Sequence, residues 1–135
     1  SKMLEVVAGK NLYSELVNSD INRYLEYNNK YTETSFDLIV AADVFTYLGD
    51  LREVFENANK ALVSGGRIIF TVSENFANKN DYFLHMSGRF LHSFSYIKNV
   101  LKMSCFELEF YHYEKLRNEG DKSVMGYIIS ARKPD

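Results

Sequence analysis

The stretch SFDLIVAADVFTYLGDL at residues 35–51 decides the fold of this chain. Residues 36–42 form an almost unbroken apolar run, which is typical of a strand covered on both faces inside a parallel sheet. Polar and aromatic residues follow at once, and Asp50 with Glu53 three positions later has the pattern of a capping box that starts a helix. The stretch therefore predicts a buried parallel strand, a turn and a helix.

The predicted helix continues into a second buried strand. Beyond Asp50, apolar residues recur at helical spacing, and the expected buried stripe consists of Leu51, Val54, Phe55, Ala58 and Leu62. We expect Gly65 and Gly66 to end the helix and RIIFTVS at residues 67–73 to form the next strand. Residues 36–73 thus predict strand, helix and strand joined by a right-handed parallel crossover.

Three further elements are predicted before this unit. Leu4, Val7 and Ala8 lie at helical spacing with Gly9 after them, which indicates a short helix over residues 2–9. SELVNSD at residues 14–20 has the pattern of a short strand that ends at Asp20. INRYLEYN at residues 21–28 predicts one or two helical turns, and a polar loop is expected to follow.

The second half of the chain adds a long loop, a helix and a hairpin. Residues 74–95 carry aromatic, arginine and histidine side chains without a clear period, and long ordered loops of this kind often carry function. Ser93 or Ser95 is predicted to cap a helix that runs to Met103 with Ile97, Val100 and Leu101 buried. Residues 106–117 and 123–133, joined by the turn NEGD, predict an antiparallel hairpin. The expected fold class is α/β, with parallel strands and a C-terminal antiparallel hairpin.

Composition limits the classes of partner. The chain has 135 residues, 46% of them hydrophobic, and a formal net charge of -2, which indicates one globular domain without a basic surface for nucleic acid or anionic lipid. No apolar stretch reaches the length that crosses a bilayer, and we expect a cytoplasmic location. The three histidines and one cysteine show no ligand spacing, so no metal site is predicted. Cys105 is interpreted as a small buried residue.

Several motifs resemble class I S-adenosylmethionine-dependent methyltransferases. FDLIVAADVFTYLGDL is similar to the fourth strand and following helix of that family, and ALVSGGRIIFTVS at residues 61–73 is similar to its helix end and fifth strand. SGRFLHSFSYIKNVLKMSCFEL at residues 87–108 and LRNEGDKSVMGYIISARKP at residues 116–134 resemble in particular the methyltransferase domains associated with tetratricopeptide repeats. This resemblance spans nearly the whole chain. It implies a Rossmann-like methyltransferase fold, S-adenosylmethionine as cofactor and an acceptor that the sequence does not identify.

The resemblance also implies that the domain is incomplete. Residues 1–21 correspond to the helix after the family's second strand and to its third strand, so the first strand, the glycine-rich turn and the ribose-binding acid would precede residue 1. We therefore expect residues 1–135 to be the C-terminal portion of a single methyltransferase domain. Without the first strand, the strand at residues 36–44 would have an unpaired edge, and we expect a homo-oligomer, such as a homodimer, joined through that edge.

The cofactor contacts are expected at two strand ends. By the resemblance, the Asp20 side chain meets the adenine amino group and the Ile21 backbone amide lies near the ring; the alternative for Asp20 is a helix cap. Ala41, Ala42 and Asp43 end a parallel strand at the edge where such sheets bind ligands. The small alanines admit a cofactor. Asp43 is expected to contact its methionine part or to orient a substrate amine, and the alternative is a turn aspartate bonded to its own backbone.

Three residues are candidates for the acceptor pocket. Tyr47 offers an aromatic wall suited to a sulfonium, and packing at a helix start is the alternative. Arg89 and His92 resemble the lid and substrate region of the subfamily. His92 is a candidate general base where the acceptor must lose a proton, and a surface-loop histidine is the alternative. Asp43, Tyr47 and His92 are thus the candidate catalytic residues.

The function that follows is methyl transfer by an incomplete domain. The alternative is a non-catalytic remnant or an oligomerising interaction module, because the sequence lacks the glycine-rich cofactor turn, and the question of enzymatic activity stays open at this point. Arg117 and Glu119 are interpreted as a simple salt bridge at the hairpin turn and not as catalytic residues.

Overall fold

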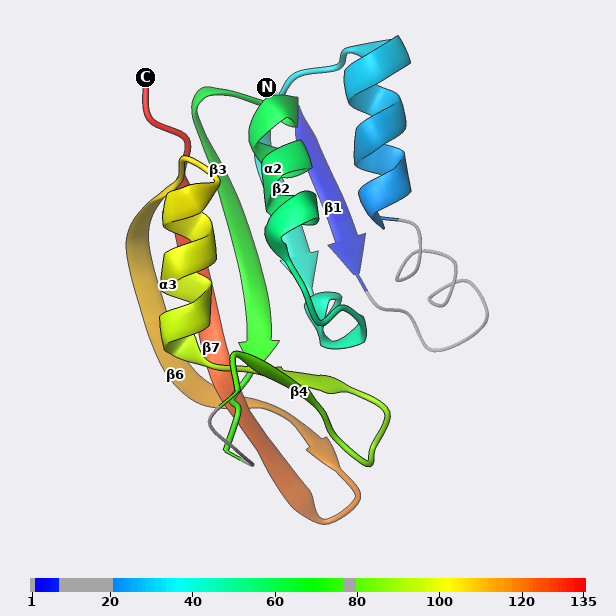
Figure 1. Cartoon of the computed structure of the whole chain (residues 1–135), viewed down its shortest axis with the longest axis vertical. Helices are drawn as coiled ribbons and strands as arrows, with labels where there is room; N and C mark the ends of the chain where they lie inside the picture. Colours follow the sequence, from blue (N-terminus) through cyan, green and yellow to red (C-terminus); the bar gives the residue numbers. More distant parts are fainter. Residues whose placement is uncertain (1, 8–20, 77–79) are drawn as a thin grey trace.

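The main sheet has five strands in the order β1-β2-β3-β7-β6. The computed structural model describes residues 2–7, 21–76 and 80–135. The strands are β1 (Met3–Val7), β2 (Phe36–Ala42), β3 (Leu62–Ser73), β6 (Glu107–Glu119) and β7 (Lys122–Arg132). The first three run parallel, whereas β7 is antiparallel to both β3 and β6 (Figure 1). The predicted α/β fold with a parallel sheet and a terminal antiparallel hairpin is confirmed.

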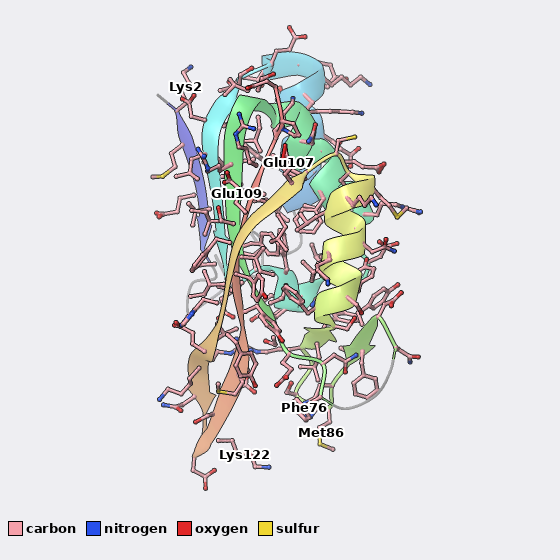
Figure 2. All side chains as sticks on the ribbon, turned by 90° about the vertical axis from the view of Figure 1, so that its left-hand side faces the viewer. Lys2, Phe76, Met86, Glu107, Glu109 and Lys122 are labelled. Atoms are coloured by element: carbon pink, nitrogen blue, oxygen red, sulfur yellow. The ribbon has the colours of Figure 1, made fainter. Side chains whose placement is uncertain are left out.

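The helices pack on one face of this sheet. Helix α2 (Arg52–Ala61), helix α3 (Phe94–Met103) and the helical residues 21–27 lie on the same side, as the edge-on view in Figure 2 shows for α3. Between helices and sheet lies one core, in which the rings of Phe45, Phe55 and Phe70 contact each other at centroid distances of 5.0 to 5.4 Å. Burying each such side chain contributes roughly 1.5–3 kcal/mol to the stability of the fold. The predicted stripe of Leu51, Val54, Phe55, Ala58 and Leu62 is buried in this core, as expected.

Asp50 lies just before helix α2 but does not form the predicted capping box. Its carboxylate accepts a hydrogen bond of 2.9 Å from the backbone N–H of Arg52. Glu53 does not reach back to the helix start, because it accepts a hydrogen bond of 2.8 Å from the side chain of Asn22. The predicted capping box is therefore wrong: Leu51 is the N-cap, its side chain makes no capping hydrogen bond, and Asp50 lies one residue before it.

The glycines that were expected to end α2 instead shape the next strand. The helix ends at Ala61, and β3 begins at Leu62 and includes both Gly65 and Gly66. Gly65 has a φ of +82°, and a Cβ at Gly66 would lie 2.9 Å from the carbonyl oxygen of Val63. A side chain at either position would be strained, so the glycines allow the sharp entry of the chain into β3.

The N-terminal segment is a strand and not the predicted helix. Met3–Val7 pairs in parallel with β2, from Met3 opposite Leu38 to Val7 opposite Ala42. Backbone pairing with β2 satisfies the amides and carbonyls on one side of this segment and outweighs the helical spacing of its apolar residues. The expectation that residues 36–44 have an unpaired edge is therefore wrong, because β2 is paired with β1 on one side and β3 on the other. The strand predicted to end at Asp20 lies outside the described residues.

Residues 74–95 contain a second, smaller sheet that the sequence did not reveal. Strands β4 (Tyr82–Leu84) and β5 (Phe90–His92) pair antiparallel, and each is only three residues long, too short to show a period. Helix α3 starts directly afterwards, capped by Ser93, whose hydroxyl accepts a hydrogen bond of 3.2 Å from the N–H of Tyr96. Ser93 and not Ser95 is thus the cap.

Two smaller expectations are corrected. In place of the polar loop after residue 28, the chain forms the π-helical turn η1 (Asn28–Thr32), which is held by a hydrogen bond of 2.8 Å from the Asn28 side chain to the carbonyl of Thr34. Cys105 is exposed and has a φ of 65°, because it lies in the turn after α3 and not in the core. Among the described residues, no helix has the length and apolar character that crossing a membrane requires.

Candidate functional site

The carboxyl ends of the parallel strands meet at one end of the molecule. Figure 1 shows β1, β2 and β3 pointing toward the end where the β4–β5 sheet and the tip of the β6–β7 hairpin lie. The turn η2 (Phe45–Tyr47) follows β2 at this end. Parallel α/β sheets bind their ligands outside the carboxyl ends of the strands, so this edge is the place to examine for a site.

Asp43 ends β2 in an unusual backbone conformation. Its φ is 60°, in the left-handed region that aspartate tolerates better than most residues. The backbone N–H of Asp43 donates a hydrogen bond of 2.8 Å to Thr71 Oγ1 in β3. Its carboxylate turns toward the hairpin, where Oδ1 accepts a hydrogen bond of 2.7 Å from Arg117 Nη1. Neighbouring strands therefore hold both the backbone and the side chain of this residue.

Four charged side chains surround this strand end, and we call them the charge cluster: Asp43, Arg89, Arg117 and Glu119. Arg117 bridges the two acids, at 2.7 Å to Asp43 and 3.1 Å to Glu119. Arg89 does the same more loosely, at 3.7 Å to Asp43 and 3.3 Å to Glu119. The formal charges sum to zero. The Arg117 side chain is only 17% exposed, so its pairing is largely shielded from water.

Arg117 is the site residue that sequence analysis missed. Its salt bridge to Glu119 is confirmed, but the guanidinium also reaches Asp43 and donates to Ser73 Oγ at 3.3 Å. Asp43 lies 74 residues earlier in the chain. A local sequence pattern does not predict a contact between residues so far apart. Only the register of β7 against β3, which brings the hairpin over the end of β3, places the two side chains together.

Tyr47 and Arg89, two of the residues expected at the acceptor pocket, lie side by side. The guanidinium carbon of Arg89 lies 5.6 Å from the centroid of the Tyr47 ring, a cation–π contact. Tyr47 is 39% exposed, so part of its ring faces away from the protein. These two side chains and Asp43 therefore form one continuous surface at the end of β2.

His92 is fully buried, so the alternative of a surface-loop histidine is wrong. Its Nε2 lies 2.8 Å from the carbonyl oxygen of Leu48 and 3.1 Å from that of Gly49, so Nε2 carries the proton and donates to both. Burial lowers the pKa of His92 to about 4, against the opposing effect of these two carbonyl acceptors. The imidazole is thus neutral near pH 7 and binds the turn after η2.

Aromatic side chains brace the same turn. The Tyr96 hydroxyl accepts a hydrogen bond of 2.9 Å from the N–H of Leu51 and donates one of 3.2 Å to Asp50. Burial, together with the nearby Asp50 carboxylate, raises the pKa of Tyr96 to about 12. At Gly49, a Cβ would lie 2.7 Å from the ring of Tyr82. His92 and these rings therefore fix the loop that carries Tyr47.

Three buried side-chain atoms of the described residues make no hydrogen bond, and all belong to this end of the molecule. They are Thr46 Oγ1, Arg89 Nη1 and His92 Nδ1. Most buried polar atoms in proteins have a partner, and an unpaired one often marks the position of a ligand or an ordered water. The unpaired atoms surround η2 and the start of β5, which agrees with a binding site there.

A pocket of about 270 Å³ adjoins the charge cluster. It lies between Glu74, Phe76 and residues 85–91 on one side and the tip of the β6–β7 hairpin on the other, and Arg89, Arg117 and Glu119 line it. Two more open hollows of about 430 Å³ lie along α2, lined by residues such as Glu26, Asn57 and Lys60. They are lined by none of the residues at the carboxyl edge, so the smaller pocket is the relevant one.

The expected cofactor residues are placed as follows. Ala41 is fully buried in the core, whereas Ala42 is partly exposed at the strand end. The Ile21 side chain is buried in the core, which leaves its backbone for contact with a ligand, and Asp20 lies outside the described residues. Within residues 2–7, 21–76 and 80–135, no group of three or more His, Cys, Asp or Glu side chains is arranged to hold a metal ion.

Comparisons with known proteins identify the fold. Residues 1–70 match the family described as a methyltransferase domain, and no curated protein matches the chain. The N-methyltransferase NodS from Bradyrhizobium japonicum is 18% identical with a TM-score of 0.62, over 100% of this chain and 86% of that protein. TehB from Haemophilus influenzae is 15% identical with a TM-score of 0.63, over 98% of this chain and 57% of that protein.

A third structure, a SAM-dependent methyltransferase from Methanosarcina mazei, is 17% identical with a TM-score of 0.60, over 75% of this chain and 60% of that protein. This chain thus spans about three fifths of the length of the first matched structures, 60% and 62% for two of them. The family match covers residues 1–70, more than half of the 135 residues, and the solved structures share the arrangement of strands and helices. The chain therefore belongs to the methyltransferase domain family and has the fold of class I S-adenosylmethionine-dependent methyltransferases.

Proposed function

We propose that this chain takes part in methyl transfer from S-adenosylmethionine to an acceptor held at the carboxyl edge of the sheet. The observation that carries the proposal is Asp43, which ends β2 with a φ of 60° and is held there by Thr71 and Arg117. A strained residue fixed at a strand end is typical of functional sites. In a methyltransferase domain, this edge is where cofactor and acceptor would meet.

The residues at the end of β2 fit the amino-acid end of the cofactor. Ala42 is small and partly exposed, so it leaves room for a ligand. Asp43 retains acceptor capacity, because its Oδ2 lies 3.7 Å from Arg89 Nη1, beyond hydrogen-bond distance. A carboxylate suits the amino group of the cofactor, and we propose Asp20 and the Ile21 amide for the adenine. When bound, S-adenosylmethionine would supply a methyl group on a cationic sulfur.

The remaining residues would position the acceptor. Methyl transfer is an in-line displacement, so alignment of the two reactants supplies much of the catalysis. Tyr47 and Arg89 form an aromatic and cationic wall beside Asp43. For His92 we propose a positioning role in place of general-base catalysis. Its imidazole is buried, neutral and hydrogen-bonded to the loop that carries Tyr47, and its pKa of about 4 makes it a weak base.

The alternative is a non-catalytic remnant or an oligomerising interaction module. The alternative predicts that the chain keeps its fold but does not bind the cofactor.

Calorimetric titration with S-adenosylhomocysteine tests the proposal. The titration is run on residues 1–135 and, in parallel, on the same chain extended upstream of residue 1. We expect binding that is weakened by Asp43→Asn and unchanged by Glu56→Gln, a matched control at an exposed position on α2. Binding by neither chain would favour the non-catalytic module. Binding by the extended chain alone would assign the cofactor cradle to upstream residues.

A further inference from the structure

Resting on the proposed function, we propose that the methyl acceptor is a small molecule with an apolar body and an anionic group, bound in the pocket of about 270 Å³ beside the charge cluster. A volume just below the usual range for ligand sites suits only a small molecule. The inference concerns the class of acceptor, which neither the family nor the fold specifies.

The pocket has an apolar wall. It is formed by the side chains of Phe76, Leu91, Val124 and Met125, which come from both sides of the pocket. Phe76 is 71% exposed, an unusual state for a large aromatic side chain. Figure 2 shows Phe76 and Lys122 at the same end of the molecule. A ligand with an apolar body would cover this exposed surface and so gain free energy in proportion to the area buried.

The pocket also carries cationic donors that are not fully used. Arg89 Nη1 is buried and makes no hydrogen bond. Lys122 lines the pocket and forms no ion pair with the described residues. Positive N–H donors are therefore available to an incoming ligand.

The acids of the pocket, in contrast, are already engaged. Glu119 accepts from Arg89 at 3.3 Å and from Arg117 at 3.1 Å. Glu74 accepts a hydrogen bond of 2.8 Å from the Tyr113 hydroxyl. A cationic ligand would have to compete with these partners, whereas an anion would meet free donors. The balance of the lining thus favours a negative group on the ligand.

The cluster also orients the ligand. Arg89 lies beside Asp43, so an anionic group bound to Arg89 would lie at the β2 end of the pocket. The apolar body would then extend toward Val124 and Met125 on the hairpin. The atom that accepts the methyl group would accordingly lie close to the anionic group, next to the proposed cofactor position. Carboxylate and phosphate share this chemistry, because arginine binds both through paired N–H donors.

Titrations followed by ¹H–¹⁵N correlation spectra test the inference. The four probes share one body and differ in charge: 3-phenylpropanoate, 3-phenylpropyl phosphate, 3-phenyl-1-propanol and 3-phenylpropylammonium. We expect the two anions to shift the amides of Leu91, Val124 and Met125 and to bind about two- to fivefold more tightly than the alcohol, with the ammonium weakest. The better of the two anions identifies the anionic group. Equal binding of the alcohol, or tighter binding of the ammonium, would overturn the inference.

Variants locate the anion. Lys122→Gln and Arg89→Gln should each weaken anion binding about two- to fivefold and leave the affinity for the alcohol unchanged. Lys115→Gln, on an exposed position of β6 outside the pocket, is the matched control and should bind as the parent chain does. If both pocket variants bind the anions normally, the assignment is wrong. Binding of S-adenosylhomocysteine without anion binding would reject this inference alone, whereas the reverse result would reject the proposed function alone.

Discussion

At His92, the buried imidazole makes the stability of the fold depend on pH. Its pKa is about 4 in the folded chain, against an ordinary value of 6.5, so the unfolded chain binds the proton more tightly. The contribution of His92 is therefore fully present above about pH 6.5 and is lost as the pH falls toward 4, by roughly 3 kcal/mol in total. Urea denaturation between pH 7.5 and 4 measures this loss in the free energy of unfolding. His92→Gln keeps an N–H donor but cannot titrate, so we expect its free energy of unfolding to depend less steeply on pH. Equal pH dependence in the two proteins would contradict the prediction.

Arg117 is expected to stabilise the fold through its contacts to three strands. Arg117→Gln would remove the hydrogen bonds to Asp43, Glu119 and Ser73 and leave Asp43 without its closest partner. We expect a loss of about 1–3 kcal/mol in the free energy of unfolding, because hydrogen bonds to charged groups contribute about that much. Arg117→Lys should recover only part of it, since lysine lacks the planar fork. Urea denaturation of both Arg117 variants measures the loss, with Lys115→Gln as the control. Equal midpoints for all three variants would contradict the prediction.

The sequence predicted individual site residues where a position in a strand was enough. Asp43 and Tyr47 were predicted from their place after a buried strand, and the structure brings them to one edge with Arg89. Arg117 and the burial of His92 were not predicted. Both depend on how distant segments fold over the strand ends, through β7 for Arg117 and through the three-residue strand β5 for His92. Pairwise contacts of this kind leave no local pattern in the sequence.

At the scale of elements, the turn after η2 has no room for a side chain at Gly49. A Cβ at Gly49 would lie 2.7 Å from Tyr82 Cε1 and 2.9 Å from Phe90 Cε1. Gly49→Ala should therefore push the turn away from β4 and β5 and lower the free energy of unfolding by about 1–3 kcal/mol. Denaturation midpoints measure the loss. In a Tyr82→Ala background the same change should cost much less, and an undiminished cost would show that the contact is not the cause.

Elements with strong local signals were predicted, and elements made by pairing were not. β2, α2, β3, α3 and the β6–β7 hairpin have long apolar patterns, caps or a turn motif, and each is confirmed. Met3–Val7 has helical spacing, yet it becomes a strand because the edge of β2 offers backbone partners. β4 and β5 have three residues each, which is fewer than a period can reveal. Sequence patterns therefore predicted the long elements better than the short strands.

For the whole molecule, self-association stays a prediction, now at a different edge. Among the described strands the outer ones are β1 and β6. β6 has two register shifts and exposed charges such as Glu107 and Lys115, features that oppose strand addition. β1 pairs without a register shift, and Met3 is 58% exposed. We expect sedimentation equilibrium at micromolar concentration to show dimers that Met3→Lys weakens; a constant monomer mass would contradict the prediction.

Stability should be distributed unevenly over the molecule, with the candidate pocket at its weaker end. Ile39, Phe70 and Ile129 are fully buried in β2, β3 and β7, whereas β4–β5 contains only short strands and Lys122 and Ser123 are exposed at the hairpin tip. Amide hydrogen exchange should therefore be slowest in the central strands and fastest in β4, β5 and residues 118–124.

A ligand in the pocket would stabilise both weak segments, the β4–β5 sheet and the hairpin tip, because it contacts both. With 3-phenylpropanoate at about ten times its Kd, we expect about tenfold slower exchange in residues 82–92 and 118–125 together, since a ligand that binds only the closed state stabilises it by that factor. The central strands exchange through global unfolding and should slow by about the same factor, because global unfolding also destroys the pocket. Slowing confined to one segment would place the ligand outside the pocket. Slowing in both would place the ligand between the hairpin and the small sheet.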